Sequence, residues 1–379
     1  MSFSFWEKET WFRGLDLLVV GGGMVGLSAA IHYKRKNPNA KVLVVERGIL
    51  PNGASTKNAG FVCFGSPSEL TDDLSHFKED ELLSTIEMRF KGYRELRKLL
   101  TDKQLGYQAS GGYELFRKAD SELYEQSMNH IDSWNKSLKL VFGQEAFIPL
   151  RAVPNEWKMK GIEFVIGLPN EGQIDTGKTM FNLQRLAQSV GILQLNGLNV
   201  LSIDDIGAKV EVTTNEGVFF SDKVAICTNG FAQKLLQPQN GSVLPARAQV
   251  FITEPIDGLP FQGIFHMHKG YYYFRNVGKR LLLGGGRHLH RKTEQTYRLQ
   301  TTAKIQNHLR RIAKRHILPQ TSFEISDSWA GIMGFGGQNE KGCLVQKISD
   351  RVACGVRLGG MGIAIGTEIG RRTAGILAD

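Results

Sequence analysis

The sequence predicts an α/β fold with two domains, one built on a parallel sheet and the other on a mixed sheet. Three observations lead to this prediction. An apolar strand, a glycine-rich turn, a helix and a second strand follow one another between Leu15 and Glu46, which is the order of a βαβ unit. A strand, a glycine turn and a helix recur after Arg351. The intervening residues show both helical and strand-like periodicity, and 379 residues suffice for two hydrophobic cores.

The first unit has the spacing of a dinucleotide-binding motif. Residues 16–20 form an apolar run of strand length, and Gly21, Gly23 and Gly26 follow it at GxGxxG spacing. The first glycine allows a tight turn, the second lets the backbone approach a pyrophosphate, and the third lets helix and strand pack closely. Glu46, at the end of the second strand, would bind ribose hydroxyls. GxGxxG alone also occurs in ordinary loops, but the complete unit predicts a Rossmann-type domain.

Composition and cysteine usage narrow the class of protein. Hydrophobic residues make up 41% and charged residues 22%, as in ordinary globular proteins. No apolar run approaches the length of a membrane span, and the N-terminal residues lack the pattern of a secretion signal. The four cysteines are far apart and form no CxxC pair. We therefore expect a cytoplasmic protein, with reduced cysteines, no metal site and no transmembrane segment.

Much of the net charge of +10 lies in residues 292–315, which we expect to form one basic helix. A solvated face is the commoner role of such a helix, and contact with an acidic partner or an anionic membrane surface is the alternative. Nucleic acid is less favoured as a partner because no nucleic-acid-binding motif accompanies the basic residues.

The remaining elements follow from periodicity and turn residues. In chain order we expect helices at residues 28–35, 79–100, 121–140, 179–190 and 231–236, and a last helix that ends at residue 378. We expect strands at residues 42–45, 107–116, 199–203, 209–214, 218–220, 223–227, 271–275, 281–287 and 351–355, and another strand after residues 245–249. Asn215, Glu216 and Gly217 indicate a hairpin turn, because glycine readily adopts the positive φ that tight turns require.

Residues 172–179 match the P-loop pattern GxxxxGK[ST], but they do not suit ATP. Asp175 lies inside the loop, where its negative charge would oppose the phosphates. No convincing strand ending in aspartate is available to hold Mg²⁺. We interpret the segment as the start of a helix that is capped by Asp175 or Thr176.

These blocks together resemble the D-amino acid oxidase (DAO) family of FAD-dependent amine and amino-acid oxidoreductases, which includes glycine oxidase, sarcosine oxidase and γ-glutamylputrescine oxidoreductase. The resemblance covers nearly the whole chain. It rests on GGGMVG with Glu46 and Arg47, GASTKNAG at 53–60, GQIDTGK at 172–178, CTNG at 227–230, PARAQ at 245–249, YYYFR at 271–275, LLLGGG at 281–286, WAG at 329–331 and LGGMG at 358–362. Several such blocks in the right order are more specific than any one of them.

The resemblance implies FAD, which we expect to be bound non-covalently. Its pyrophosphate would lie on the glycines of residues 21–26, and residues 53–60 would line the ribityl chain and the flavin. Residues 359–362 would lie along the pyrimidine edge of the flavin, where N–H groups would stabilise the negative charge left by hydride transfer. The implied cofactor-binding residues are Gly21, Gly23, Met24, Val25, Gly26, Glu46, Arg47, Gly53, Ala54, Ser55, Thr56, Asn58, Ala59, Gly60, Val200, Thr228, Asn229, Gly230, Gly331, Gly359, Gly360, Met361 and Gly362.

The implied reaction is oxidation of the C–N bond of a small amine or amino acid by hydride transfer to flavin N5, with oxygen or another carrier as the electron acceptor. Some relatives hold a substrate carboxylate with an arginine just after the Trp-x-Gly block, whereas this chain continues Ile332, Met333, Gly334. A carboxylate would therefore need Arg275 or Arg287. Because of this difference, we rank an amine above a simple α-amino acid as the substrate. Our candidate substrate-binding residues are Tyr273 and Arg275.

We also predict how the chain is divided between the two domains. We expect a discontinuous FAD-binding domain of residues 1–85, 172–240 and 327–379, and a substrate domain of residues 86–171 and 241–326. The alternative function is a flavin-binding module that acts on or with RNA through residues 292–315. An NAD-dependent dehydrogenase is disfavoured, because the GASTKNAG and LGGMG blocks have no role with nicotinamide.

Overall fold

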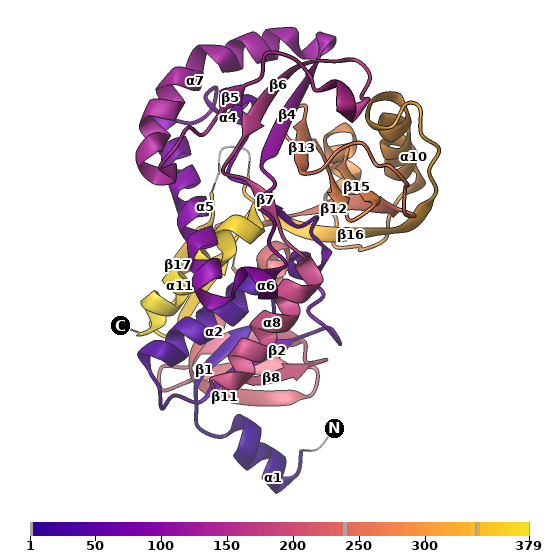
Figure 1. Cartoon of the computed structure of the whole chain (residues 1–379). Coiled ribbons are helices and arrows are strands. Elements are labelled where there is room, and N and C mark those ends of the chain that lie inside the picture. Colours follow the sequence, from indigo (N-terminus) through magenta and orange to yellow (C-terminus); the bar gives the residue numbers. More distant parts are fainter. Residues whose placement is uncertain (1–2, 238–240, 338–339, 341, 379) are drawn as a thin grey trace.

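The structure, a computed structural model, describes residues 3–237, 241–337, 340 and 342–378. Two eight-stranded sheets form the two halves of the molecule, and a short ribbon of β3 (Phe61–Val62) and β7 (Gly172–Gln173) lies between them (Figure 1). One sheet has a parallel centre, and the other is mixed. The predicted α/β class is therefore confirmed.

Helices of very different length connect the strands. The α-helices are α1 (Phe5–Glu7), α2 (Met24–Lys36), α3 (Ala54–Lys57), α4 (Pro67–Asp73), α5 (Glu79–Leu99), α6 (Asp102–Leu105), α7 (Ser121–Phe142), α8 (Thr176–Ser189), α9 (Arg291–Glu294), α10 (Ala303–Ile312) and α11 (Gly362–Ala378). Short 3₁₀ or π turns cover Lys8–Phe12, Lys118–Asp120, Asn155–Trp157, Asn229–Lys234, Arg287–His290 and Ala313–Ile317.

The first sheet is organised around β1 (Leu15–Val20). The sheet has the order β17-β18-β11-β1-β2-β8. The other strands of this order are β2 (Val42–Glu46), β8 (Leu193–Asn196), β11 (Gly217–Ile226), β17 (Leu344–Lys347) and β18 (Val352–Val356). Strand β10 (Val210–Thr214) pairs with β11, and β9 (Val200–Asp205) pairs with β10. Leu17 and Val19 enter one hydrophobic core, whereas Leu18 and Val20 enter a second core on the opposite face. Burial on both faces explains why residues 17–20 are all apolar.

Helices α2 and α11 lie side by side against this sheet. A Cβ on Gly370 would come within 2.6 Å of the Val25 carbonyl oxygen, so only glycine allows this approach. Ser28 Oγ donates to the Thr367 carbonyl at 2.9 Å. Since Gly366 contacts Met24 and Gly370 contacts Val25, the two helices run in the same direction. Their N-termini, with their partial positive charge, therefore lie on the same side of the sheet.

The second sheet has the order β16-β12-β15-β14-β13-β4-β6-β5. Its strands are β4 (Gly112–Arg117), β5 (Ile148–Pro149), β6 (Ile162–Leu168), β12 (Leu244–Thr253), β13 (Ile264–Met267), β14 (Tyr272–Val277), β15 (Arg280–Gly285) and β16 (Ile325–Phe335). Phe265 and Phe274 stack 4.7 Å apart in its core. Helices α7 and α10 lie beside this half of the molecule (Figure 1).

Several predicted elements differ in extent from those observed. The first helix begins at Met24 rather than at residue 28, because the glycine turn leads directly into it. The two strands expected at residues 218–220 and 223–227 form one strand, Gly217–Ile226, since the first half of β11 pairs with β10 and the second half with β1. The predicted helix at residues 231–236 is a 3₁₀ turn. The predicted cap of α8 is confirmed: Asp175 Oδ1 accepts from Lys178 N at 2.9 Å.

The prediction of one basic helix at residues 292–315 is wrong. The chain forms α9, then an extended segment, and only then α10. The cause is Glu294, which is buried and accepts bidentate hydrogen bonds from Arg247 on β12 at 2.8 Å and another from Gln249. Helix α9 ends at Glu294, whose side chain points into the protein toward Arg247. Helix α10 then buries its own apolar face through Ile305 and Leu309.

The predicted domain limits remain a prediction. Strand β16 pairs with β12 along its length, so residues 327–335 belong to the second sheet although we expected them in the FAD-binding domain. Helix α5 crosses the predicted limit at residue 85 and packs against α11. None of the helices in the described part of the chain is long and apolar enough to span a membrane.

Removing the buried carboxylate of Glu294 should strongly destabilise the fold. In Glu294→Gln the Arg247 guanidinium remains buried without its counter-charge, and we expect the free energy of unfolding to fall by about 3 kcal/mol. Glu254→Gln is the matched control, because its pair with Arg280 is exposed and should contribute less than about 1 kcal/mol. Urea unfolding of both variants measures the difference, and equal losses would contradict this assignment.

Candidate active site

A cavity of about 680 Å³ is lined by residues from both sheets. Most of the predicted cofactor-binding residues line it: Gly21, Gly23, Met24, Val25, Glu46, Arg47, Gly53, Ala54, Ser55, Asn58, Ala59, Val200, Thr228, Asn229, Gly331, Gly359, Gly360, Met361 and Gly362. Tyr273 also lines it, whereas Gly26, Thr56, Gly60, Gly230 and Arg275 lie behind its wall. Segments far apart in the sequence therefore meet at one place.

The first glycine turn has the geometry that the GxGxxG spacing predicts. Gly21 has a φ of +112°, and a Cβ there would lie 2.8 Å from the Cys227 carbonyl oxygen. A Cβ on Gly26 would lie 1.9 Å from the Gly21 carbonyl oxygen, so this glycine serves helix packing rather than the cavity. Gly23 is the N-cap of α2, and its Cβ would meet Ser55 Oγ at 2.9 Å. The turn is therefore a cradle that side chains would fill.

Glu46 organises this cradle from the end of β2. Its carboxylate is buried and accepts from Gly22 N at 3.1 Å and from Gly48 N at 2.9 Å. Met24 N, in the first turn of α2, donates to Ser55 Oγ at 2.9 Å. The N–H groups and partial positive charge at this helix end, next to a carboxylate, suit the phosphates and ribose of a dinucleotide.

The GASTKNAG segment is held in place by Asn58. The Asn58 side-chain nitrogen donates to the carbonyls of Ala54 and Ser55, and its oxygen accepts from Gly60 N at 2.9 Å and from Thr176 Oγ1 at 2.7 Å. Thr56 Oγ1 donates to Pro51 O at 2.6 Å. Trp329 Nε1 donates to Lys57 O at 3.0 Å. These contacts fix the loop between β7, α8 and β16, so that its small residues face the cavity.

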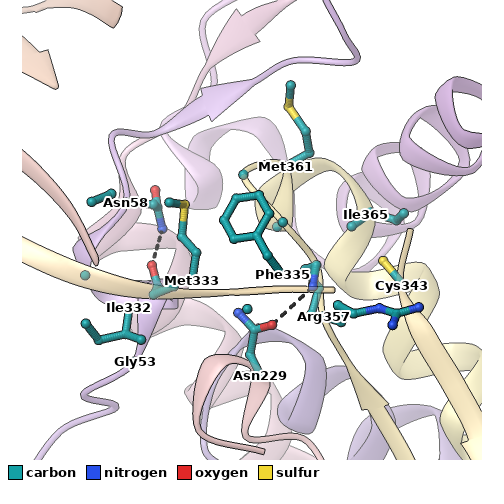
Figure 2. A pocket seen from close by; sticks show the side chains of 18 of the residues that line it. Gly53, Asn58, Asn229, Ile332, Met333, Phe335, Cys343, Arg357, Met361 and Ile365 are labelled. Atoms are coloured by element: carbon teal, nitrogen blue, oxygen red, sulfur yellow. Dashed lines mark hydrogen bonds between the residues drawn. The ribbon is translucent and has the colours of Figure 1, made fainter. Parts of the chain in front are cut away.

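The last glycine turn approaches the cavity from the other side. Asn229 Oδ1 accepts from Leu358 N at 3.1 Å, and Gly359 N donates to Gly334 O at 2.9 Å. Figure 2 shows Asn58, Met333, Phe335 and Met361 around one space. The hydroxyl of Thr228 is buried without a protein partner in the part of the chain that the structure describes. Such an orphaned polar group is consistent with a site that binds a polar ligand.

Arg275 is not where a substrate-binding residue would be. Its Nη1 donates to the carbonyls of Gly60 and Ile174 and to Gln173 Oε1, at 3.0–3.3 Å. Burial lowers the pKa of Arg275 to about 10. The side chain thus ties the β3–β7 ribbon to the second sheet, and we drop it as a substrate ligand.

Arg287, the other arginine that we considered, lines the cavity. Its guanidinium carbon lies 4.6 Å from the centre of the Phe335 ring. Burial lowers the pKa of Arg287, and no carboxylate within the described ranges forms an ion pair with it. Tyr273 lies nearby and is close enough to Gly284 that a Cβ there would meet its ring at 2.4 Å. Burial raises the pKa of Tyr273 to about 12, so its phenol is neutral.

Sequence reasoning missed a buried ion pair in the cavity wall. His266 Nε2 and Glu171 Oε2 are 2.9 Å apart, and Phe64 N donates to Glu171 Oε1 at 3.1 Å. Burial alone would lower the pKa of His266, but the charge and hydrogen bond of Glu171 outweigh burial and raise it. Within the described residues, no group of His, Cys, Asp and Glu side chains has the arrangement of a metal site. No spacing in the sequence connects positions 171 and 266.

Comparison with known proteins gives both a family and a fold. A family model described as FAD dependent oxidoreductase matches residues 16–376. The chain is 23% identical over 333 residues to the probable oxidoreductase OrdL of Rhizobium meliloti, covering 85% of this chain and 74% of that protein. The crystal structure of glycine oxidase from Bacillus cereus matches with a TM-score of 0.76 at 17% identity, over 96% of this chain and 94% of that one. Iminodiacetate oxidase from Chelativorans matches with a TM-score of 0.71 at 19% identity, over 95% of both chains.

The α2 N-terminus offers a direct test of the cradle. In Gly23→Ala the new Cβ would displace Ser55 and occupy the approach to the first amides of the helix, so we expect FAD affinity to fall at least about 10-fold. Gly375→Ala is the control: Gly375 lies in α11 outside the cavity lining, and its Cβ would meet nothing within 4 Å. Titration of apoprotein with FAD by flavin fluorescence measures both affinities. Equal affinities would argue against this placement of the phosphates.

Proposed function

Because the chain belongs to the DAO family of FAD-dependent oxidoreductases, we propose that it oxidises the C–N bond of a small amine or amino acid. In this reaction a hydride leaves the carbon next to nitrogen for flavin N5, and the resulting imine hydrolyses. One observation carries the proposal: a single cavity joins the dinucleotide cradle of α2 to Tyr273 on the second sheet and to Arg287 in the turn after β15. FAD supplies the redox chemistry, and the chain holds the reactants together.

The residues that would hold FAD follow from the cavity. The α2 N-terminus and Glu46 would bind the pyrophosphate and the ribose, and the Asn58 loop would line the flavin side. The turn at residues 359–362 and the start of α11 would face the pyrimidine edge, where backbone N–H groups stabilise negative charge. We propose that FAD is held through these contacts without a covalent bond.

Arg287 supports a substrate that carries an anionic group. The Arg287 guanidinium lies in the cavity wall and forms no ion pair with a carboxylate among the described residues. An incoming anion would stabilise it, and its planar donors match a carboxylate. Met333, which follows the Trp329 block, lines the same cavity, as does Phe335 beneath Arg287. Arg287, in the 3₁₀ turn that follows β15, would thus bind the carboxylate in place of an arginine after the Trp329 block. A carboxylate-bearing amine is therefore preferred over the simple amine that the sequence favoured.

Names of similar proteins are consistent with this choice. Glycine oxidase and iminodiacetate oxidase are named for small amines that carry carboxylates. We do not propose RNA binding. The basic residues 292–315 do not form one continuous helix, and α10 buries part of its surface.

Anaerobic mixing tests the proposed reaction. We expect glycine, iminodiacetate or another carboxylate-bearing amine to bleach the oxidised-flavin absorbance of the purified holoenzyme, because two electrons pass to FAD when the C–N bond is oxidised. Methylamine serves as the counterpart without a carboxylate. A broad panel of amines and amino acids that leaves the flavin oxidised would sink the proposal.

The role of Arg287 has a separate test. Arg287→Gln removes the positive charge, so we expect the Kd of carboxylate-bearing substrates to rise about 10- to 100-fold, with little effect on amines that lack an acid group. Arg280→Gln is the matched control, because Arg280 lies at the start of β15, pairs with Glu254 and does not line the cavity, so substrate binding should be unchanged. Spectral titration of the flavin with substrate gives the affinities, and parallel behaviour of the two variants would rule Arg287 out.

A further inference from the structure

His266 is a buried histidine in the cavity wall for which the proposed reaction has so far given no role. It is 5% exposed and lies on β13 directly opposite Tyr273 of β14. Residues opposite each other on neighbouring strands share a face, so both rings belong to the same side of the sheet. The Phe61 ring, 5.6 Å from His266 and 5.7 Å from Tyr273, contacts both. All three residues line the cavity.

The partner of His266 determines which of its nitrogens remains available as a proton acceptor. Glu171 is buried and holds Nε2 at 2.9 Å, while its other oxygen accepts from Phe64 N. Because a carboxylate only accepts hydrogen bonds, neutral His266 carries its hydrogen on Nε2. Nδ1 is then left with a free lone pair. This is the arrangement of a histidine held by a carboxylate as a proton acceptor.

The charges around His266 favour a cation at this wall. Besides Glu171, the carboxylates of Glu114 on β4 and Glu69 on α4 act on it, and Arg89 on α5 is the nearby positive charge. Glu114 is fully buried and accepts from the side chains of Ser66 and Ser68, and burial raises its pKa. Tyr273, opposite His266, and Cys63, which also lines the cavity, are neutral groups, because burial raises the pKa of both.

The opposite charge lies further across the sheet, on the other side of Tyr273. Tyr273 packs on Gly284, and Arg287 follows three residues later. The order across the sheet is therefore His266 with its carboxylates, then Tyr273, then Arg287. A molecule with a positive and a negative group is oriented by such a field, with its ammonium toward His266.

We propose that His266 accepts the proton which the substrate ammonium must lose before oxidation, and that Glu171 is its positioning residue. This inference rests on the proposed function. In the step, the ammonium N–H bond breaks, its electron pair stays on nitrogen and the proton binds His266 Nδ1. The neutral amine then forms the C=N bond as the hydride leaves its carbon. Glu171 balances the imidazolium charge that results.

The pH dependence of the reaction has a defined sign. His266 accepts a proton only when it is neutral, so the rate falls as pH drops through its pKa. Since Glu171 raises that pKa, the acid limb of kcat/KM should lie above the range of an ordinary histidine. Glu171→Gln should move the limb to lower pH by about 1 unit or more.

Variants at two neighbouring histidines separate a chemical from a structural role. His266→Gln should abolish this limb and lower the rate of flavin reduction by glycine or iminodiacetate about 100-fold or more near neutral pH. The rate should recover at high pH, where the amine is already neutral in solution. His268→Gln is the matched control, because His268 lies 3.6 Å from Asp120 and does not line the cavity. The FAD content of each variant is measured as well, so that a loss of cofactor is not mistaken for a lower rate of flavin reduction.

Each other outcome contradicts a specific claim. If His266→Gln reduces its flavin with the pH profile of the unaltered enzyme, the inference is wrong and the proposed function stands. If Glu171→Gln slows reduction equally at every pH, the ion pair is only structural. If the unaltered holoenzyme is reduced by no amine, the proposed function fails and this inference fails with it.

Discussion

The close approach of Gly26 to the carbonyl of Gly21 is the constraint on which the rest of the site depends. It seats α2 against the end of β1, and only a residue without a Cβ permits it. Glycines of α11 repeat the same solution against α2, so both helices begin beside the cavity. Two helix N-termini then direct unsatisfied N–H groups and positive potential into one space. The geometry suits a cofactor that is anionic at its phosphates and becomes more negative at its flavin on reduction.

The cavity exists because two sheets meet, and few polar contacts set how they meet. Arg275 crosses from β14 to the ribbon of β3 and β7, Asn58 reaches Thr176, and Trp329 reaches Lys57. Such buried hydrogen bonds add little net stability when they are made but cost a great deal when one partner is lost. These hydrogen bonds therefore mainly fix the position of one half of the molecule relative to the other. Arg275, which we considered for substrate binding, donates instead to the carbonyls of Gly60 and Ile174 and to the Gln173 side chain.

Much of the function could be predicted from the sequence. The family, FAD as cofactor and the enzyme class are all confirmed, and most of the residues named for the cofactor line one cavity. Glycine spacing reports local backbone geometry directly, which is why GxGxxG and Glu46 were informative. The cap at Asp175 was predictable for the same reason, since it involves residues three positions apart. The basic segment misled us because a charge pattern does not reveal that Glu294 turns inward to Arg247.

By itself, then, the sequence determined the βαβ unit, the closing glycine turn with its helix, and the membership of an oxidoreductase family. Only the tertiary structure decided that Arg287 rather than Arg275 faces the cavity, and that Glu171 meets His266 across 95 residues of chain. The physical reason is range. A turn or a cap depends on neighbours in the sequence, whereas the partner of a buried charge depends on strand order, register and packing between sheets.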